Sequence, residues 1–273
     1  MRQRARVGVV HRVRGLTVHG THDGGTWASA CAVAALLAVY LLAASARRRE
    51  ARGWSGWRTA AFATGAALLA AGLSPPVAAL GHDLRGHMLQ HLLIGMLAPV
   101  GLVLGAPVTL LLRTLPPPGR RALGRALASR AAHVLTGPWV ALVLSVGGMA
   151  ALYCTPLYGL VTGDPALCHL LHAHFLLAGC LFAWAMAGPD PAPRRPSVPH
   201  RLVVLGVAVA AHATVAQLMY AGLLTGLTAP GRELRGAAEL MYYGGDAAEV
   251  LLALAMVTTW RPSRRRAPAL QAS

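Results

Sequence analysis

The stretch HDLRGHMLQHLLIGMLAPVGLVLGAPVTLLLR, residues 82–113, decides the fold, because a dense polar cluster turns there into a long apolar run. His87 and His91 are four residues apart, so in a helix they stand one above the other on the same face. Asp83 lies four residues before His87 and would share that face if the helix extends to it. A helix needs about 20 mostly apolar residues to cross a bilayer. The stretch therefore predicts a membrane-buried helix with Asp83, His87 and His91 at its mouth.

The composition places the chain among integral membrane proteins. Of its 273 residues, 55% are apolar and only 12% are charged, whereas a soluble domain carries about 25% charged residues. The 25 basic residues are all arginines, and they fall in short clusters between apolar runs. That distribution is typical of membrane topology signals and not of a nucleic-acid-binding surface. We therefore expect the lipid bilayer, and no nucleic acid, as a partner.

The apolar runs predict an all-α, polytopic bundle of seven transmembrane helices. Ser74-Pro75-Pro76 predicts a kink or early termination near the end of the second run, and Pro99 and Pro107 should bend the third. We divide the chain into a flexible basic N-terminal arm (1–26), a seven-span transmembrane domain (27–262) and a basic cytoplasmic tail (263–273). The predicted spans are 27–46, 59–80, 87–113, 137–153, 167–187, 202–225 and 237–260.

The arginines also predict the orientation of the bundle. The connections 47–58, 113–133, 188–201 and 261–273 hold 17 arginines, whereas the opposite loops 81–86, 154–167 and 226–236 hold 3. Loops rich in arginine stay in the cytoplasm. The N-terminus is therefore expected outside and the C-terminus in the cytoplasm, although five arginines in the N-terminal arm argue against this.

With this topology, most of the polar side chains within the spans gather in the outer half or near the middle of the membrane. An ionisable group at the bilayer centre costs at least ~2.5 kcal/mol, so it normally faces the bundle interior and pairs with another group. Histidine with methionine or cysteine suits copper, especially Cu(I), so two histidine-bearing helix mouths on one side predict a metal site. The side chains are Asp83, His87 and His91 on the third span, Cys168, His169 and His172 on the fifth, His212 and Met219 on the sixth, and Glu239, Tyr242, Asp246 and Glu249 on the seventh.

Each of these groups has a structural alternative. A histidine pair at a helix end can be a solvated interfacial pair, and Asp246 can be a polar link between helices as readily as a proton or metal group. Only the agreement of two histidine clusters on one side favours a functional site. The sequence carries no phosphate loop, nucleophile elbow or zinc-protease motif, so we predict a protein that is not an enzyme.

Three blocks of the sequence resemble the CtaG family of bacterial membrane proteins, which are assembly factors for caa-type cytochrome c oxidase. The blocks are HMLQHLLIGMLAPVGLVLGAPVTLLLR (87–113), HAHFLLAGCLFAWAMAGPDPAPRR (172–195) and LMYYGGDAAEVLLALAMVTTW (240–260). The resemblance covers roughly residues 55–262 and implies a multi-pass protein of the bacterial plasma membrane, with cytochrome c oxidase subunits as partners and a role in copper handling. His87, His91 and His172 match the family's histidines. The family's upstream partner on the fifth span stands four residues before His172, where this chain has Cys168.

The leading hypothesis is a non-enzymatic assembly factor whose outward-facing site holds copper for a nascent oxidase subunit. Its expected ligands are His87, His91 and His172, supplemented by His169, Cys168 or Met219, with Asp83 orienting a histidine. The alternatives are a b-type cytochrome with haem between His91 and His172, a copper or proton transporter using His212, Asp246 and Glu249, and a purely structural scaffold for the oxidase.

Overall fold

A computed structural model describes residues 21–50, 53–80, 83–192, 195–224, 226–227 and 229–258. His82, most of the predicted N-terminal arm (1–20) and the predicted tail (263–273) lie outside these residues. The predicted all-α class is confirmed for the described part, which contains helices and no strand. The first helix begins at Thr21, six residues before the predicted start of the first span at residue 27.

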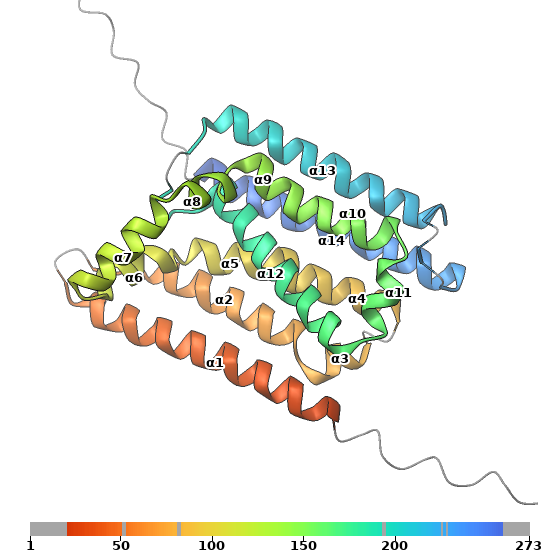
Figure 1. Cartoon of the computed structure of the whole chain (residues 1–273), viewed down its shortest axis with the longest axis horizontal. Helices are drawn as coiled ribbons and strands as arrows, with labels where there is room; N and C mark the ends of the chain where they lie inside the picture. The colour runs from red at the N-terminus through yellow and green to blue at the C-terminus, as the bar shows by residue number, and fades with distance from the viewer. Residues whose placement is uncertain are drawn as a thin grey trace, which may run out of the picture.

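The long helices lie side by side in a bundle, with α1 along one edge and α13 along the other, and α12 crosses between them (Figure 1). The elements are α1 (Thr21–Arg48), α2 (Gly56–Gly72), α3 (Pro75–Leu80), α4 (Leu84–Gln90), the π-helix η1 (His91–Leu97), α5 (Ala98–Leu104), α6 (Pro107–Thr114), α7 (Pro117–Leu127), α8 (Arg130–Leu135), α9 (Pro138–Leu142), the π-helix η2 (Val143–Gly147), α10 (Gly148–Cys154), α11 (Leu157–Thr162), α12 (Pro165–Ala187), α13 (Val198–Tyr220) and α14 (Gly231–Thr258).

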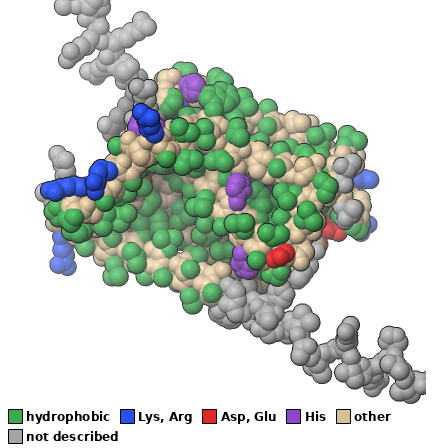
Figure 2. Space-filling view, viewed as in Figure 1, with side chains coloured by type: hydrophobic (Ala, Val, Ile, Leu, Met, Phe, Trp, Pro, Cys, Tyr) green, Lys and Arg blue, Asp and Glu red, His purple; other side chains and the backbone are tan. Residues whose placement is uncertain are grey.

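The helices and their surface are those of a membrane protein. Hydrophobic side chains cover the middle of the face in Figure 2, and arginines gather at its two ends. The shorter apolar helix Pro138–Cys154 and α2, with 17 residues, occupy the places of two further predicted spans. The count of seven spans and the sides of the two termini remain predictions. Within the described residues, five helices are long and apolar enough to cross a bilayer: Ala28–Arg48, Leu84–Leu104, Pro165–Ala187, Val198–Tyr220 and Gly231–Thr258.

Prolines set the ends of two helices. The second predicted span stops at Gly72, and α3 begins anew at Pro75, which confirms the early termination predicted there. The third predicted span, 87–113, is not one bent helix: it breaks after Leu104, and Ala106 takes a left-handed conformation with φ 52° before Pro107 starts α6. Proline disfavours the right-handed helical conformation in the residue before it. The Tyr40 hydroxyl donates to the Gly105 carbonyl at 2.7 Å, so a polar group at the break is satisfied.

The first two family-like blocks meet at this break. Asp190, from the sequence GPDPAPRR, is only 3% exposed and caps the first turn of α6. Its carboxylate accepts hydrogen bonds from the backbone N–H groups of Val108 at 3.1 Å and Thr109 at 2.7 Å, and from the Thr109 hydroxyl. A carboxylate at a helix N-terminus satisfies N–H groups that have no partner within the helix. The contact ties the segment after α12 to the broken end of the third span.

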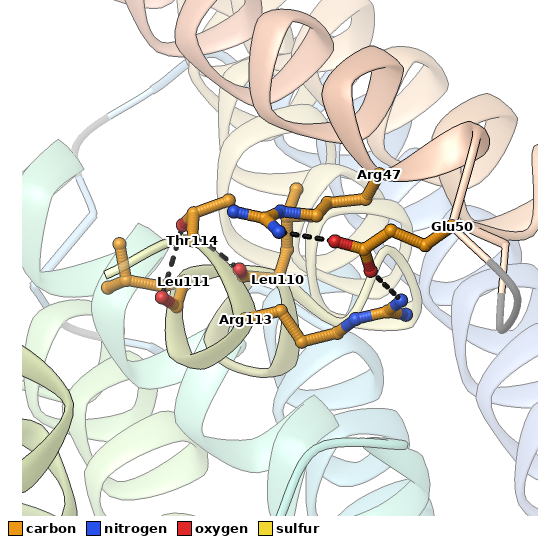
Figure 3. A network of polar contacts seen from close by, with 6 residues as sticks. All are labelled: Arg47, Glu50, Leu110, Leu111, Arg113 and Thr114. Carbon is orange, nitrogen blue, oxygen red and sulfur yellow. Dashed lines mark hydrogen bonds and ion pairs between the residues drawn. The ribbon is translucent and has the colours of Figure 1, made fainter. Parts of the chain in front are cut away.

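A second link joins α1 to α6 at the same end of the bundle. Glu50, just beyond α1, lies between Arg47 and Arg113 (Figure 3). Its carboxylate accepts from Arg113 Nη2 at 2.7 Å and from Arg47 Nη1. These two hydrogen bonds lower the pKa of Glu50 below its usual value. The arginines that predict the cytoplasmic side therefore also connect two helices.

Candidate functional site

The interior of the bundle holds a cavity of about 50 Å³. One water needs roughly 10–15 Å³ of such space, so the cavity can hold a few water-sized groups. Its walls come from the third span, from η2 and α10, and from α12, α13 and α14. Both π-helices of the described chain face it, η1 through His91, Gly95 and Met96 and η2 through Ser145 and Val146. π-Helical segments are rare and are frequent at functional sites.

The close approach of α12 to η1 shapes this cavity. Pro99 has no N–H group, so the carbonyl of Gly95, four residues earlier, lacks its usual helical donor. A Cβ atom at Gly179 of α12 would overlap that carbonyl oxygen and the Pro99 ring. Gly179 therefore lets α12 lie directly on the helix that carries His91.

Three buried polar side chains from three helices meet at the cavity: His91, His212 of α13 and Glu249 of α14. The His91 and His212 ring centroids are 6.5 Å apart. His212 Nδ1 lies 3.8 Å from Glu249 Oε1. Each residue keeps one buried polar atom without a hydrogen-bond partner: His91 Nδ1, His212 Nε2 and Glu249 Oε2. Such atoms are costly in an apolar interior, so this cluster is the strongest candidate for a functional site.

The third family-like block positions His212. A Cβ atom at Gly245 would overlap the His212 imidazole. The ring thus lies against the backbone of α14 at the GGDAAE sequence. Sequence reasoning placed His212 and Glu249 among the polar interior residues, but it missed Gly245. Ser145 was missed as well, and nothing in the apolar sequence around it singles it out.

His87 lies closer to the start of α4 and is 3% exposed. Its Nε2 atom is 3.1 Å from the Tyr153 hydroxyl. Its ring packs edge-on against Tyr158 of α11, with 5.0 Å between centroids. Burial is the main cause that raises the pKa of Tyr158 to about 12, so this hydroxyl stays protonated at neutral pH. The sequence did not indicate either tyrosine.

Of the candidate residues on the fifth predicted span, only His172 lies towards the buried histidines of the third span. His172 is half-buried, and its Nε2 atom has no hydrogen-bond partner. Phe175, one turn further along α12, packs edge-on against His91 with 4.5 Å between ring centroids. His169 is exposed, and its Nδ1 atom is 2.6 Å from the Pro165 carbonyl of its own helix. Cys168 is half-buried and has a free thiol. The third and fifth predicted spans are therefore neighbours, as a shared site requires.

The other predicted site residues lie apart from the cavity. Asp83 does not continue the helix but caps it, because its carboxylate accepts from the Gly86 N–H at 2.7 Å. It makes this contact in place of the expected one with a histidine. Met219 is fully buried in an apolar cluster. Glu239 is exposed, and Tyr242 and Asp246 are half-buried on α14.

The predicted ligands do not form a ready-made metal centre. Among the described residues, no three His, Cys, Asp or Glu side chains are close enough together to hold one ion. Two imidazoles that bind one metal from opposite sides have ring centroids about 6 Å apart, since each metal–nitrogen bond is about 2.0 Å. The separation of His91 and His212 is close to this value, and each ring has an unpartnered nitrogen.

The chain is similar in sequence to one known protein family and to several known proteins. The sequence model of the family described as cytochrome c oxidase caa3 assembly factor (Caa3_CtaG) matches residues 38–263. Uncharacterized proteins of Mycobacterium bovis and Mycobacterium tuberculosis are each 38% identical over 182 residues, 64% of this chain. One of Mycobacterium leprae is 35% identical over 156 residues, 54% of this chain. The matches cover only 28% and 24% of those relatives. No solved structure matches the chain.

Proposed function

The chain belongs to the cytochrome c oxidase caa3 assembly factor family, and from that premise we propose that it holds copper for the metallation of a nascent oxidase subunit. The protein is a multi-pass factor of the bacterial plasma membrane, and it catalyses no reaction. Copper is its cargo, bound transiently and then passed on. The site is the interior cavity, with His91 and His212 as ligands.

The observation that carries this proposal is the pair of unpartnered imidazole nitrogens, His91 Nδ1 and His212 Nε2, on one small cavity. Imidazole binds copper well, and thioethers favour Cu(I). Met96 and Met149, whose side chains carry thioethers, line the same cavity. Glu249 lies 3.8 Å from His212, close enough to become the carboxylate neighbour that orients a ligating imidazole in many metal sites.

His87 and His172 each lie about one turn nearer the predicted outer end of the bundle than the cavity-lining residues His91 and Phe175. His87 is held by Tyr153, whereas His172 has an unpartnered nitrogen. We propose that these two histidines pass copper between the outer surface and the cavity. The three main ligands inferred from sequence are thus divided: His91 forms an inner pair with His212, which the sequence placed among the polar interior residues, and His87 and His172 form an outer pair.

The cavity does not favour the haem alternative. A haem macrocycle between His91 and His172 needs far more room than a cavity of about 50 Å³ provides. A transporter would need polar residues that continue to the other side of the bundle. Beyond the cavity lies an apolar cluster that includes Val204, Leu205 and Met256, and the buried Arg201 at that end is held by the Met186 carbonyl, which favours a fixed core over a path for ions.

The test is Cu(I) binding by the purified full-length protein, measured by competition with a chromophoric chelator. We expect stoichiometric binding by the wild type and its loss in the His91→Leu/His212→Leu variant. The matched control is His133→Leu/His200→Leu, which removes two exposed histidines elsewhere in the bundle. Cytochrome c oxidase activity in the host membranes should fall with the first variant alone. Copper binding that survives in the first variant, or an intense Soret band in the wild type, would refute the proposal.

A further inference from the structure

The three arginines of the predicted outer loops converge on one pocket. Those loops hold only Arg85, Arg232 and Arg235, and all three line a pocket of about 450 Å³ with Tyr220, Gly236 and Glu239. Arg85 precedes the third span, whereas the other two open α14, so the fold unites residues about 150 positions apart in the chain. Arginine is disfavoured in short outer loops, so their convergence needs a reason other than topology.

Arg85 is held in place in this pocket. Its Nη2 atom donates to the Arg232 carbonyl at 2.9 Å. A Cβ atom at Gly236 would overlap the Arg85 guanidinium, so glycine leaves the space in which it lies against α14. Nearby, Glu233 accepts from the Leu84 N–H at 2.6 Å and fastens the two helices together. The guanidinium is therefore ordered before any ligand arrives, which reduces the entropy lost on binding.

The pocket carries more positive than negative charge. Glu239 is its only acidic residue, and no ion pair joins any of the three arginines to an acidic side chain in the described part of the chain. Three like charges in one pocket repel one another. An anion would relieve this repulsion, and guanidinium groups bind phosphate oxygens through paired N–H donors.

We infer that this pocket, formed by Arg85, Arg232 and Arg235, binds the headgroup phosphate of an anionic phospholipid from the adjacent leaflet. The apolar surface next to it favours a lipid over a soluble anion. Tyr220, in the pocket wall, is 50% exposed at the end of α13, and Tyr243 is 70% exposed one turn along α14 from Glu239. Exposed tyrosines at span ends are typical of the membrane interface. They provide contacts for the glycerol and upper acyl chains.

The test is native mass spectrometry of the purified full-length protein with added phosphatidylglycerol or phosphatidylcholine. We expect the wild type to retain phosphatidylglycerol preferentially. The Arg85→Gln/Arg232→Gln/Arg235→Gln variant should bind it about a hundredfold more weakly, because each arginine near an anionic membrane surface strengthens the attraction by a factor of about five. The matched control is Arg120→Gln/Arg121→Gln/Arg125→Gln on α7, which removes the same charge at the other end of the bundle and should retain the preference.

Each other outcome would overturn the inference. Equal losses in the two triple variants would make binding a general effect of charge. Displacement of the lipid by excess inorganic phosphate would assign the pocket to a soluble anion. If the first triple variant does not fold, Glu239→Gln provides a second test, since it removes the pocket's only negative charge and should strengthen phosphatidylglycerol binding. Unchanged binding in that variant would refute the inference.

Discussion

Replacing His212 and Glu249 together by leucine should leave the fold at least as stable while abolishing oxidase assembly. Both side chains are at least 90% buried, and each has a polar atom without a partner. An unsatisfied buried polar group costs roughly 1–3 kcal/mol. Cavity water lowers that penalty by supplying hydrogen bonds. Replacing both residues by leucine removes two such unsatisfied groups, so we expect the free energy of unfolding to rise by about 2 kcal/mol.

The assay is unfolding of the purified variants in detergent, alongside cytochrome c oxidase activity in membranes that contain them. Gln90→Leu is the control for a buried polar group that is satisfied. Gln90 is 6% exposed, and its Nε2 atom donates to the Gly72 carbonyl at 3.1 Å. This variant loses that hydrogen bond and should be destabilised by about 1 kcal/mol. If the leucine pair lowers stability, or leaves oxidase activity intact, His212 and Glu249 are structural residues and our assignment of the site is refuted.

Two further predictions concern the end of the bundle predicted to be cytoplasmic. Asp190→Ala should lower the free energy of unfolding by about 3 kcal/mol, because it leaves N–H groups of α6 unsatisfied. The control is Asp164→Ala, which removes an exposed cap of α12 and should cost less than about 1 kcal/mol. Equal losses of the two variants, measured by unfolding in detergent, would contradict this prediction. The lowered pKa of Glu50 means that its stabilisation is complete above the usual glutamate value of about 4.3 and disappears as the pH falls through the lowered value. The unfolding profiles of wild type and Glu50→Gln should therefore converge in acid, and parallel profiles would disprove the coupling.

The sequence predicts the helices well because apolar length and proline position act locally. Ser74-Pro75-Pro76 and Pro107 both predict an interruption, because the proline ring permits either a kink or an end of the helix. At Pro107 the structure has a full break after Leu104. The outcome depends on Asp190 and Tyr40, which satisfy polar groups at the break from distant parts of the chain. Helical periodicity contains no information about such partners.

The sequence predicts which types of residue form the candidate site, but it does not predict which of them lie next to one another. Sequence alone placed His91 with His87, since both lie on one face of one helix. The ring of His91 instead approaches His212, from a helix more than 100 residues later. That pairing depends on the π-helical turn that begins at His91 and on Gly245, which makes room for His212. Neither feature has a periodic signal in the sequence.

The three family-like blocks all contribute residues that position the rings at the cavity. A search for ligands by histidine spacing alone misses these residues, because several of them are glycine or proline. The first block supplies His91 and the proline that frees the Gly95 carbonyl. The second supplies Gly179, whose lack of a side chain leaves room for that carbonyl, and the third supplies Gly245 beneath His212. A site for transient cargo must keep ligating atoms free of internal hydrogen bonds, which a well-packed core does not favour. Glycine contacts and π-helical turns meet this requirement because they fix where the rings lie without supplying donors or acceptors to them.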